Sequence, residues 1–411
     1  MKLSKSGVFG LILSFLCPLL SIVFSFMNIK RENYRLMNVA ISISVFSIIL
    51  TIPPYQDLYR RYIENYLSYN IQTTYIQAVA GHVDVLMYVV ALFMKKHSIP
   101  FYFFPAIQAG VVNYLFLSST RDVVESKYYL GGKRIPYLLS FLFINILAGA
   151  LGIRFYMAVA LFTKGLTLYL FRGRFNSAVI FIFLSVMFHF SAALPIIALF
   201  TSRIVKLKYR FVPFYFLMGF VFGSFLLLDI INSGVLGYLG QYIKSGYIDF
   251  STNADVDTKG NAIVVTVWRY FILLFLYIPC YKLYNKKNDD TGFLNFIGVY
   301  FVICSLTAIS FNAFNRYIIA YGSFFVLLNC FIVMNFRVKK IQINIFIFIL
   351  VFNFLFQNIY LQRRPILFGE MWKGLYMPFL INIEKSDYDF KIQMNQIDEY
   401  GDWIKDRVAS E

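Results

Sequence analysis

Long apolar segments separated by short polar ones recur along almost the whole chain. A helix of about 17 to 25 apolar residues is long enough to cross the hydrocarbon core of a bilayer, so each such segment is predicted to be a transmembrane helix. We predict about twelve of them. They are 8–27, 36–52, 82–94, 99–118, 135–152, 153–171, 177–200, 211–231, 263–284, 292–313, 316–336 and 341–360, of which 82–94 is shorter than the rest. The pattern therefore predicts an all-α polytopic membrane protein.

The composition agrees with this prediction. Of the 411 residues, 59% are hydrophobic and 14% are charged, whereas about a quarter of a soluble protein is charged. A net charge of +17 would suggest nucleic-acid binding in a soluble chain, but here the basic residues cluster in short loops, where they act as topology signals. We expect no nucleic-acid partner. If the first span begins outside, the cytoplasmic loops are 30–35, 95–97, 202–210, 285–287 and 337–340.

Three longer polar segments are predicted on the opposite face, at 53–84, 118–134 and 232–261. Function is expected to reside there. The two halves of the chain show no internal repeat of the kind that many transporters carry. We therefore predict one integral membrane domain, 1–361, followed by an interfacial segment and a soluble C-terminal tail, 362–411.

Arg154 and His189 both occur in apolar segments, where polar groups usually face a bundle interior and mark a functional path. If FRGRF (171–175) is the turn between two antiparallel helices, both residues lie about 23–27 Å from it and at similar depth. An arginine and a histidine at one depth could bind a pyrophosphate. Alternatively, backbone carbonyls or Asn145 satisfy both side chains.

The segment after Pro53 and Pro54 has tyrosines and aliphatic residues at helical spacing, which predicts an interfacial amphipathic helix. Its charged residues are spaced four apart, in the pairs Asp57–Arg61 and Arg60–Glu64. These are either surface ion pairs of small energy or part of a site. In a site, Asp57 would deprotonate a sugar hydroxyl and the two arginines would bind substrate.

Three further residues are candidates for substrate binding. Arg316 lies at the junction of two predicted spans and either snorkels to the membrane surface or binds a second phosphate. Tyr321 follows about one helical turn later, and Tyr242 lies in the long polar segment 232–261. Tyrosine rings stack on apolar sugar faces, but tyrosine is also common in the interfacial belts of membrane proteins.

Motifs for metals and nucleotides are weak or missing. Two triplets, Asp255-Val-Asp257 and Asp387-Tyr-Asp389, match a D-x-D pattern that holds a divalent cation in some sugar-nucleotide enzymes, but a pattern this short arises easily by chance. The four cysteines show no CxxC spacing, and GxxxxGK[ST], GxGxxG and HExxH do not occur. We expect no metal and no cofactor.

Several short motifs follow one another along the chain: Asp57-Leu-Tyr-Arg-Arg-Tyr, Asp84-Val-Leu-Met-Tyr, Ile153-Arg154 with Ala158, His189-Phe-Ser191-Ala192, and Arg316 with Tyr321. In this order they resemble the Wzy-type polysaccharide polymerases, specifically the EpsG-like branch. The family's usual glycine before the first acidic residue is absent, and its acid-proline pair appears as Asp84-Val85.

The resemblance implies a GT-C-like glycosyltransferase with amphipathic loops at the outer face of the bacterial inner membrane. It would polymerise undecaprenyl-diphosphate-linked oligosaccharide repeat units into O-antigen, the polysaccharide of lipopolysaccharide, or a similar surface glycan. Membrane lipid, a flippase and a chain-length regulator would be its partners. The residues implied are Arg154, His189 and Asp57 for catalysis, and Arg316, Arg60, Arg61, Asp84, Tyr321 and Tyr242 for substrate binding.

Topology conflicts with this assignment at one point. If the loop at 202–210 is cytoplasmic, FRGRF lies outside and Arg154 lies near the inside, unless 135–152 or 190–200 is broken or re-entrant. Pro195 offers such a break. Two other functions remain open: a flippase or transporter for the lipid-linked unit, and a membrane acyltransferase in which the lone intramembrane histidine is the base.

Overall fold

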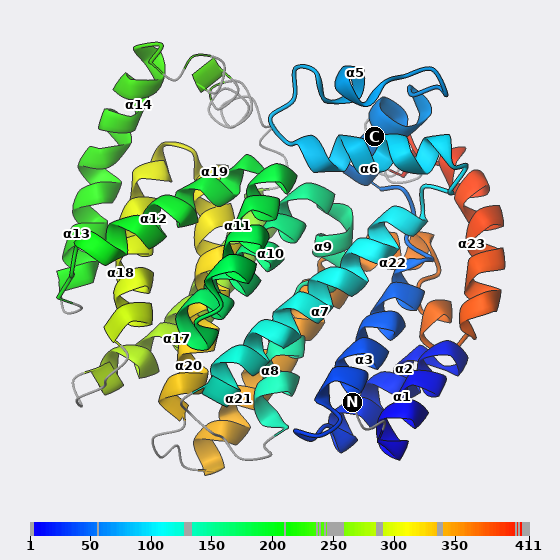
Figure 1. Cartoon of the computed structure of the whole chain (residues 1–411), viewed down its shortest axis with the longest axis horizontal. Helices are drawn as coiled ribbons and strands as arrows, with labels where there is room; N and C mark the ends of the chain where they lie inside the picture. The colour runs from blue at the N-terminus through cyan, green and yellow to red at the C-terminus, as the bar shows by residue number, and fades with distance from the viewer. Residues whose placement is uncertain are drawn as a thin grey trace. The chain divides into compact units, whose positions relative to one another are not determined.

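The computed structural model describes residues 4–55, 57–126, 134–208, 211–235, 259–284, 291–334 and 340–398, with single residues between 237 and 244 and between 401 and 404. In these ranges every named element is a helix (Figure 1). The chain divides into two compact units. Unit 1 contains Met1–Phe190 and Lys339–Glu411, and unit 2 contains Ser191–Val338.

Unit 1 contains most of the sequence motifs. Its helices are α1 (Lys5–Leu16), α2 (Pro18–Asn28), α3 (Tyr34–Ile49), α4 (Asp57–Arg61), η1 (Tyr62–Leu67), α5 (Tyr75–Val79), α6 (Val85–Lys96), α7 (Phe103–Ser126), α8 (Ile135–Phe143), α9 (Ile146–Leu151), α10 (Ile153–Arg172), α11 (Phe175–Phe188), α21 (Lys340–Phe354), η9 (Leu355–Tyr360), α22 (Arg363–Phe368), η10 (Lys373–Leu375) and α23 (Phe379–Met394).

The first predicted span is a helical hairpin. The backbone is extended at Cys17, and Pro18 begins α2, a position where its missing N–H costs nothing. The hydroxyl of Ser21 donates to the carbonyl of Gly10 at 2.9 Å across the hairpin. Helices of 12 and 11 residues are about 16–18 Å long, too short for a core of about 30 Å. The prediction of one continuous span at 8–27 is therefore wrong.

Helices α3 and α7 are antiparallel and define two ends of unit 1. The amide of Asn38 donates to the carbonyl of Tyr114 at 3.2 Å, and the ring of Phe46 stacks near Phe103. We call the end that contains the C-terminus of α3 and the N-terminus of α7 the site end. The other, which we call the far end, contains Tyr34 and the C-terminus of α7.

Helix α10 runs parallel to α7, because α8 and α9 carry the chain back to the site end between them. At that end the Gln108 side-chain amide donates to the carbonyl of Ile153. Nearer the far end, the Lys164 amine contacts the Asp122 carboxylate at 2.5 Å. The predicted span 135–152 is thus two short helices separated by a break at residues 144–145.

Side-chain amides satisfy the backbone at this break. Asn358 accepts a hydrogen bond from the Ile146 N–H at 2.7 Å and donates to the Ile144 carbonyl at 3.2 Å. Asn145 accepts from the Ala148 N–H at 3.2 Å. Backbone groups inside a bilayer must be paired within the protein, so these two asparagines allow the helix to stop and restart. The restart places the first turn of α10 at the site end.

A second break interrupts the predicted span 177–200. Helix α11 ends at Phe188, and His189 has extended backbone. The FRGRF turn lies at the far end, where the Arg172 guanidinium contacts Asp122 at 2.9 Å. Helix α10 therefore begins at the site end, and α11 returns to it. Arg154 and His189 lie at the same end of unit 1, as the interpretation of 153–189 as an antiparallel hairpin predicted.

Two polar segments lie at ends of unit 1 other than those predicted. Arg121 lies over the ring of Tyr34 at 4.6 Å, so residues 118–126 share the far end with the basic loop 30–35. The other segment is 95–97: Lys95 lies over the Tyr66 ring at 5.0 Å, at the site end. The reason is that α6 has 12 residues, too few to span, and it crosses the end of α3 and α7 (Figure 1).

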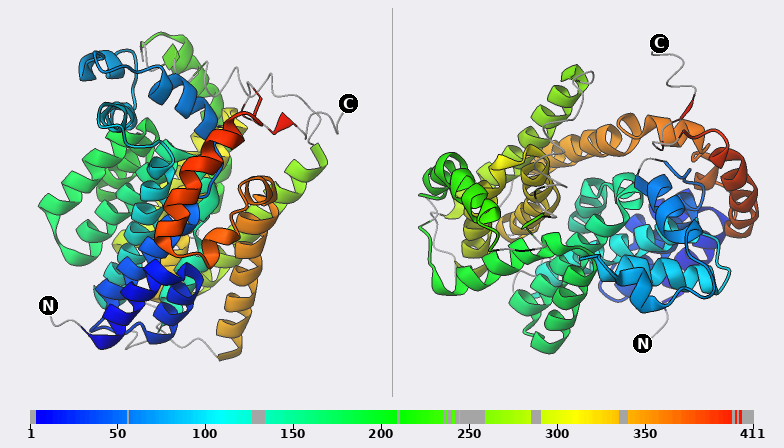
Figure 2. Two further views of the ribbon diagram at one scale, coloured as in Figure 1. Left: turned by 90° about the vertical axis from the view of Figure 1, so that its right-hand side faces the viewer. Right: turned by 90° about the horizontal axis from the view of Figure 1, so that it is seen from above.

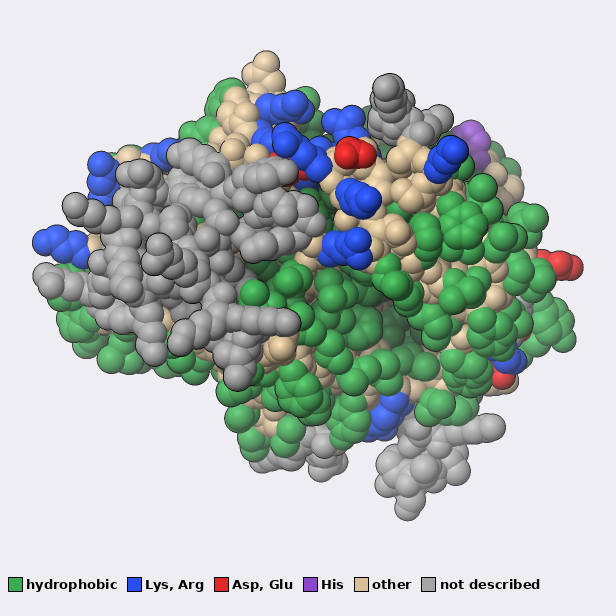
Figure 3. Space-filling model, turned by 90° about the horizontal axis from the view of Figure 1, so that it is seen from below, with side chains coloured by type: hydrophobic (Ala, Val, Ile, Leu, Met, Phe, Trp, Pro, Cys, Tyr) green, Lys and Arg blue, Asp and Glu red, His purple; other side chains and the backbone are tan. Residues whose placement is uncertain are grey.

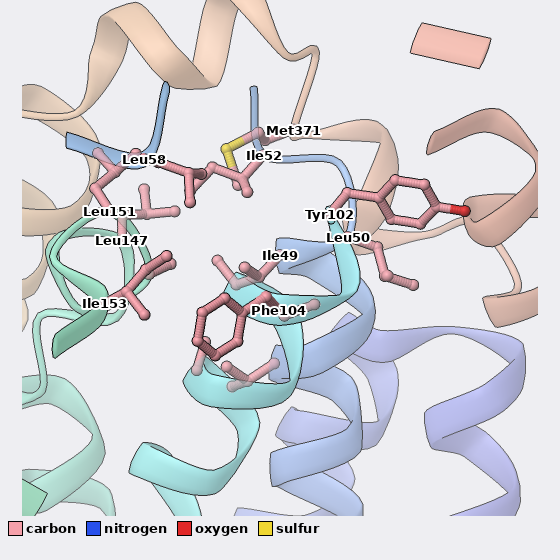
Figure 4. Packing of buried hydrophobic residues seen from close by; sticks show 14 of the residues in the cluster. Ile49, Leu50, Ile52, Leu58, Tyr102, Phe104, Leu147, Leu151, Ile153 and Met371 are labelled. Carbon is pink, nitrogen blue, oxygen red and sulfur yellow. The ribbon is translucent and has the colours of Figure 1, made fainter. Parts of the chain in front are cut away.

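A hydrophobic core lies directly beneath the site end (Figure 4). Leu58 follows Asp57 in sequence, and Ile153 precedes Arg154. Both side chains are fully buried. Leu58 lies close to Leu147 and Leu151 of α9 in the close-up view. Burial of leucine side chains stabilises a fold by about 1.5–3 kcal/mol each. The same contacts therefore hold the polar neighbours Asp57 and Arg154 in place.

The C-terminal helix α23 packs lengthwise on unit 1 (Figure 2). The amide of Asn382 donates to the hydroxyl of Ser47 on α3 at 3.0 Å, and Phe379 contacts the rings of Phe15 and Phe46. The interfacial nature of 362–411 stays a prediction. Segment 363–394 is helical and belongs to the same compact unit as α1–α3.

Unit 2 is built around α18. Its helices are η2 (Phe190–Ala192, which begins at the last residue of unit 1), α12 (Ala193–Ile204), α13 (Val212–Met218), η4 (Gly219–Gly223), α14 (Ser224–Asn232), α17 (Lys259–Tyr284), α18 (Thr291–Ser305), η7 (Leu306–Ile309), α19 (Phe311–Asn315), η8 (Arg316–Gly322) and α20 (Ser323–Met334). The Asn295 amide of α18 donates to the carbonyls of Ser202 and Val205 at 2.7 and 2.8 Å. This side chain caps the C-terminus of α12, where carbonyls have no partner within the helix.

Helix length and surface character are those of a polytopic membrane protein. Four helical segments of the described chain are long and apolar enough to cross a bilayer, and shorter apolar helices accompany them. The long segments are Ile153–Arg172, Val212–Asn232, Phe311–Ile332 and Ile343–Tyr360. Apolar side chains cover wide areas of the surface, with basic side chains gathered between them on the face shown in Figure 3. Such apolar surface is expected where helices face lipid.

Candidate functional site

Asp84 joins three segments at the site end. Its carboxylate accepts a hydrogen bond from Nη1 of Arg154 at 2.8 Å and another from the backbone N–H of Phe190 at 2.9 Å. The side chain of Asp84 is 1% exposed, and that of Arg154 is 16% exposed. One carboxylate thus connects the start of α6, the first turn of α10 and the chain that leaves α11. Asp84 therefore holds the three segments of the site together and also places a carboxylate beside Arg154.

The location of Arg154 explains why it needs this partner. A helix N-terminus has a partial positive charge, so a guanidinium in the first turn of α10 is unfavourable unless an anion lies beside it. Asp84 supplies that anion. Burial raises the pKa of Asp84, while the charge of Arg154 and the Phe190 N–H act in the opposite direction. The N-terminus of α10 and Arg154 together form a place that attracts negative charge.

A second ion cluster, on α4 and η1, lies beside the first. Asp57 contacts Arg60 at 2.6 Å and Arg61 at 3.3 Å, and Arg61 also contacts Glu64 at 3.3 Å. The predicted pair Asp57–Arg61 is confirmed, but Glu64 pairs with Arg61 rather than with Arg60. Arg61 is not a surface residue, because its side chain is only 9% exposed, against 56% for Arg60.

The charges of the two clusters act on each other. Burial alone would raise the pKa of Asp57, but the charge of Arg61, the hydrogen bond from Arg60 and the charge of Arg154 outweigh it and hold this pKa below its usual range. Asp57 is therefore ionised and a weak proton acceptor. The contacts of Asp57 suit it to orient Arg60 and Arg61 rather than to deprotonate a hydroxyl.

His82 is the other titratable group here. It lies two residues before Asp84, in the loop between α5 and α6, and its ring is exposed. One face of the imidazole stacks on Tyr88 with centroids 3.8 Å apart and planes within 9°. Burial and the charges of Arg154 and Arg61 lower its pKa, against smaller opposite effects of Asp84 and Glu64. His82 is thus an accessible imidazole that favours its neutral form.

His189 has a different environment. It is 3% exposed, and its ring makes an edge contact with Phe155 at 5.7 Å and stacks near Phe190 at 4.9 Å. Its backbone N–H closes α11 on the carbonyl of Ser185. The extended backbone at His189 directs the next N–H, that of Phe190, to Asp84. This geometry gives His189 a clear part in ending the helix.

The remaining predicted residues are in unit 2 or outside the described chain. Arg316 begins the π-helical turn η8 and is exposed. Tyr321 is fully buried in the same turn, with its hydroxyl 3.3 Å from that of Ser191. Tyr242, Asp255 and Asp257 lie outside the described residues. Within the parts of the chain that are described, no group of three or more His, Cys, Asp or Glu side chains could hold a metal ion.

Sequence reasoning missed a buried ion network on α7 and α10. Asp122 contacts both Lys164 and Arg172, and Glu125 contacts Arg172 at 3.1 Å and Arg121 at 2.9 Å. A lysine in the apolar stretch VALFTKGLTLYLF, ten residues after Arg154, was the available signal. Sequence reasoning also missed His82, because a histidine in a polar loop does not stand out unless the residues that surround it in the fold are known.

Comparison with known proteins places the chain in a family. No curated protein and no solved structure is detectably similar to the chain. The EpsG family matches residues 54–367, which is more than half of the sequence and includes all of Asp57, Asp84, Arg154 and His189. The chain therefore belongs to the EpsG family and is a polysaccharide polymerase-like membrane protein.

Proposed function

We propose that this protein is a glycosyltransferase that polymerises undecaprenyl-diphosphate-linked oligosaccharide repeat units at the outer face of the bacterial inner membrane. The observation that carries the proposal is the Arg154 guanidinium, held by Asp84 in the first turn of a membrane-spanning helix. A diphosphate at a membrane surface needs cationic donors at that depth. Arginine supplies several N–H donors in a planar fork that matches phosphate oxygens.

The roles of the site residues follow from their burial and contacts. Arg154, assisted by the N-terminus of α10, would stabilise the charge that develops on the diphosphate as it leaves. Arg61 and the exposed Arg60 would bind the second phosphate or the sugar, oriented by Asp57. We assign Asp84 and His189 to positioning, because one holds Arg154 and the other ends α11 beside it.

The chemistry requires no nucleotide. The donor sugar is already joined to a good leaving group, so the protein has to orient two lipid-borne glycans and stabilise charge. Arg316 and Tyr321 of unit 2, together with Tyr242, remain proposed contacts for the glycan.

Purified protein with lipid-linked repeat units is expected to produce a ladder of longer glycans in the presence of a chelator. The reason is that arginines, rather than a cation, would neutralise the leaving diphosphate. Electrophoresis of the lipid-linked products measures chain length. Loss of the ladder in chelator with recovery in Mg²⁺ or Mn²⁺ would show that a divalent cation is required.

A strain without the protein separates a polymerase from a flippase. Accumulation of a lipid that bears one repeat unit in this strain would support a polymerase. Absence of any repeat unit at the cell surface would support a flippase.

The proposed sidedness can be tested with single cysteines on a background that lacks the four native ones. Gln72 is exposed at the site end and Asn176 is exposed beside FRGRF at the far end. With a membrane-impermeant thiol reagent on intact spheroplasts, Gln72→Cys is expected to label and Asn176→Cys is not. Lysed cells should label both and serve as the control. The reverse pattern would place Arg154 toward the cytoplasm and contradict an outer-face site.

A further inference from the structure

We propose that His82 is the general base that removes the proton from the acceptor sugar hydroxyl, an inference that rests on the function proposed above. The evidence is the location of an exposed imidazole at the site end, two residues from the carboxylate that holds Arg154. A general base must reach its substrate, and among the site's titratable groups this side chain combines exposure with freedom from an ion pair in the described structure.

The carboxylates of the site are less suited to the task. Asp84 is almost fully buried and accepts hydrogen bonds from Arg154 and from the Phe190 N–H. Asp57 accepts from Arg60 and Arg61. The burial of Asp84 keeps a substrate hydroxyl away from its carboxylate, whereas the arginines beside Asp57 hold the pKa of that carboxyl below its usual range, so Asp57 takes up a proton poorly. Glu64 is in contact with Arg61 as well.

His189, the histidine that the sequence pointed to, is enclosed. Its ring lies against Phe155 and Phe190 and is 3% exposed as a residue. Proton transfer needs an approach of about 2.6–3.2 Å between heavy atoms, which an acceptor sugar entering from solvent achieves at His82 far more readily.

The local structure holds His82 in place. Its backbone N–H donates to the Val79 carbonyl at 3.1 Å, and Gly81 has a φ of 75°, a conformation that side chains other than glycine rarely adopt. The turn presents the imidazole face to Tyr88, which leaves its edge, with both nitrogens, directed away from the stack. The groups that surround it are Arg61, Glu64, Asp84, Tyr88 and Arg154.

The step balances without a further reactant. As the acceptor oxygen bonds to the anomeric carbon of the donor sugar, its proton passes to a ring nitrogen of His82. The bond from that carbon to the diphosphate breaks, and the lipid diphosphate leaves with the electron pair beside Arg154. Exposure of the protonated imidazole then allows it to lose the proton to water. A neutral imidazole is needed at the start, and the lowered pKa favours it.

Initial polymerisation rates measured against pH with the full-length protein test the assignment. The pH–rate profile of the wild-type protein is expected to have one limb, along which the rate rises with increasing pH below about 6.5, the ordinary histidine pKa. His82→Gln should lower kcat by about 100-fold or more with little change in KM, and the limb should vanish, because glutamine cannot accept the proton. Added imidazole should restore part of the rate to His82→Ala, which a purely structural role would not allow.

His97→Gln is the matched control, since His97 ends α6 and packs against Phe93. It should keep both the rate and the limb. A His82→Gln protein with a rate within about threefold of wild type and an intact limb overturns the assignment of His82 alone. Failure of the wild-type protein to lengthen lipid-linked glycans overturns the proposed function itself.

Discussion

Replacement of Arg154 by lysine is expected to lower chain extension by about 100-fold or more, and replacement by alanine to abolish it. Lysine retains the charge and can still pair with Asp84, but it lacks the planar fork of donors. Loss of a donor directed at developing charge costs about 2.7–4 kcal/mol of transition-state stabilisation. Glycan ladders from membranes that contain equal amounts of each variant measure the effect.

Arg172→Lys is the control for this experiment. Arg172 ends the same helix and is likewise paired with carboxylates, Asp122 and Glu125, but at the far end. We expect this variant to polymerise normally. If Arg154→Lys also makes long polymer at wild-type levels, Arg154 serves only as the partner of Asp84, and the diphosphate must be bound elsewhere.

Breaking the buried pair of Asp122 and Lys164 is expected to destabilise the protein by about 3–5 kcal/mol in Asp122→Asn and by less in Lys164→Met, because Arg172 still pairs with Asp122. The two side chains are 8% and 11% exposed, so removal of the Asp122 carboxylate leaves the Lys164 amine charged and poorly solvated. Thermal unfolding in detergent or in nanodiscs measures the loss. The double variant Asp122→Leu with Lys164→Met should recover much of the stability, because an apolar pair can replace a buried ion pair.

An exposed ion pair gives the matched comparison. Arg60 and Asp57 are 56% and 33% exposed, and exposed pairs contribute about 0–1 kcal/mol. Arg60→Met should therefore change the unfolding temperature little. Single variants at Asp122 and Lys164 that unfold at the wild-type temperature would mean that the network does not join α7 to α10.

Much of the architecture and of the site chemistry was predictable from local sequence. Apolar runs predicted helices and a membrane, because both depend on composition over some twenty residues. The spacing of Arg154 and His189 about FRGRF predicted that they share one end, because an antiparallel hairpin relates position to depth through the helix rise alone. The pair Asp57–Arg61 followed from the helical repeat in the same way.

Other features of the molecule were decided by tertiary structure. The breaks at Cys17, Asn145 and His189 depend on partners far away in the chain, such as Asn358, which pairs the backbone freed at residues 144 and 146. A hydropathy pattern does not record such partners, so it overestimated the continuous spans. It also misplaced the segments 95–97 and 118–126, whose location follows from α6 lying across the bundle.

The partners of the charged groups were likewise set by the fold. Asp84 and Arg154 are seventy residues apart in sequence, and the short motifs that contain them do not show that they meet. Nor do they distinguish the exposed His82 from the enclosed His189, because exposure depends on which helices pack around each ring. By itself, then, the sequence determined the helices, the membrane environment and the family, since these follow from local composition and order. Only the tertiary structure decided which carboxylate holds Arg154 and which histidine is exposed, because both depend on contacts between distant segments.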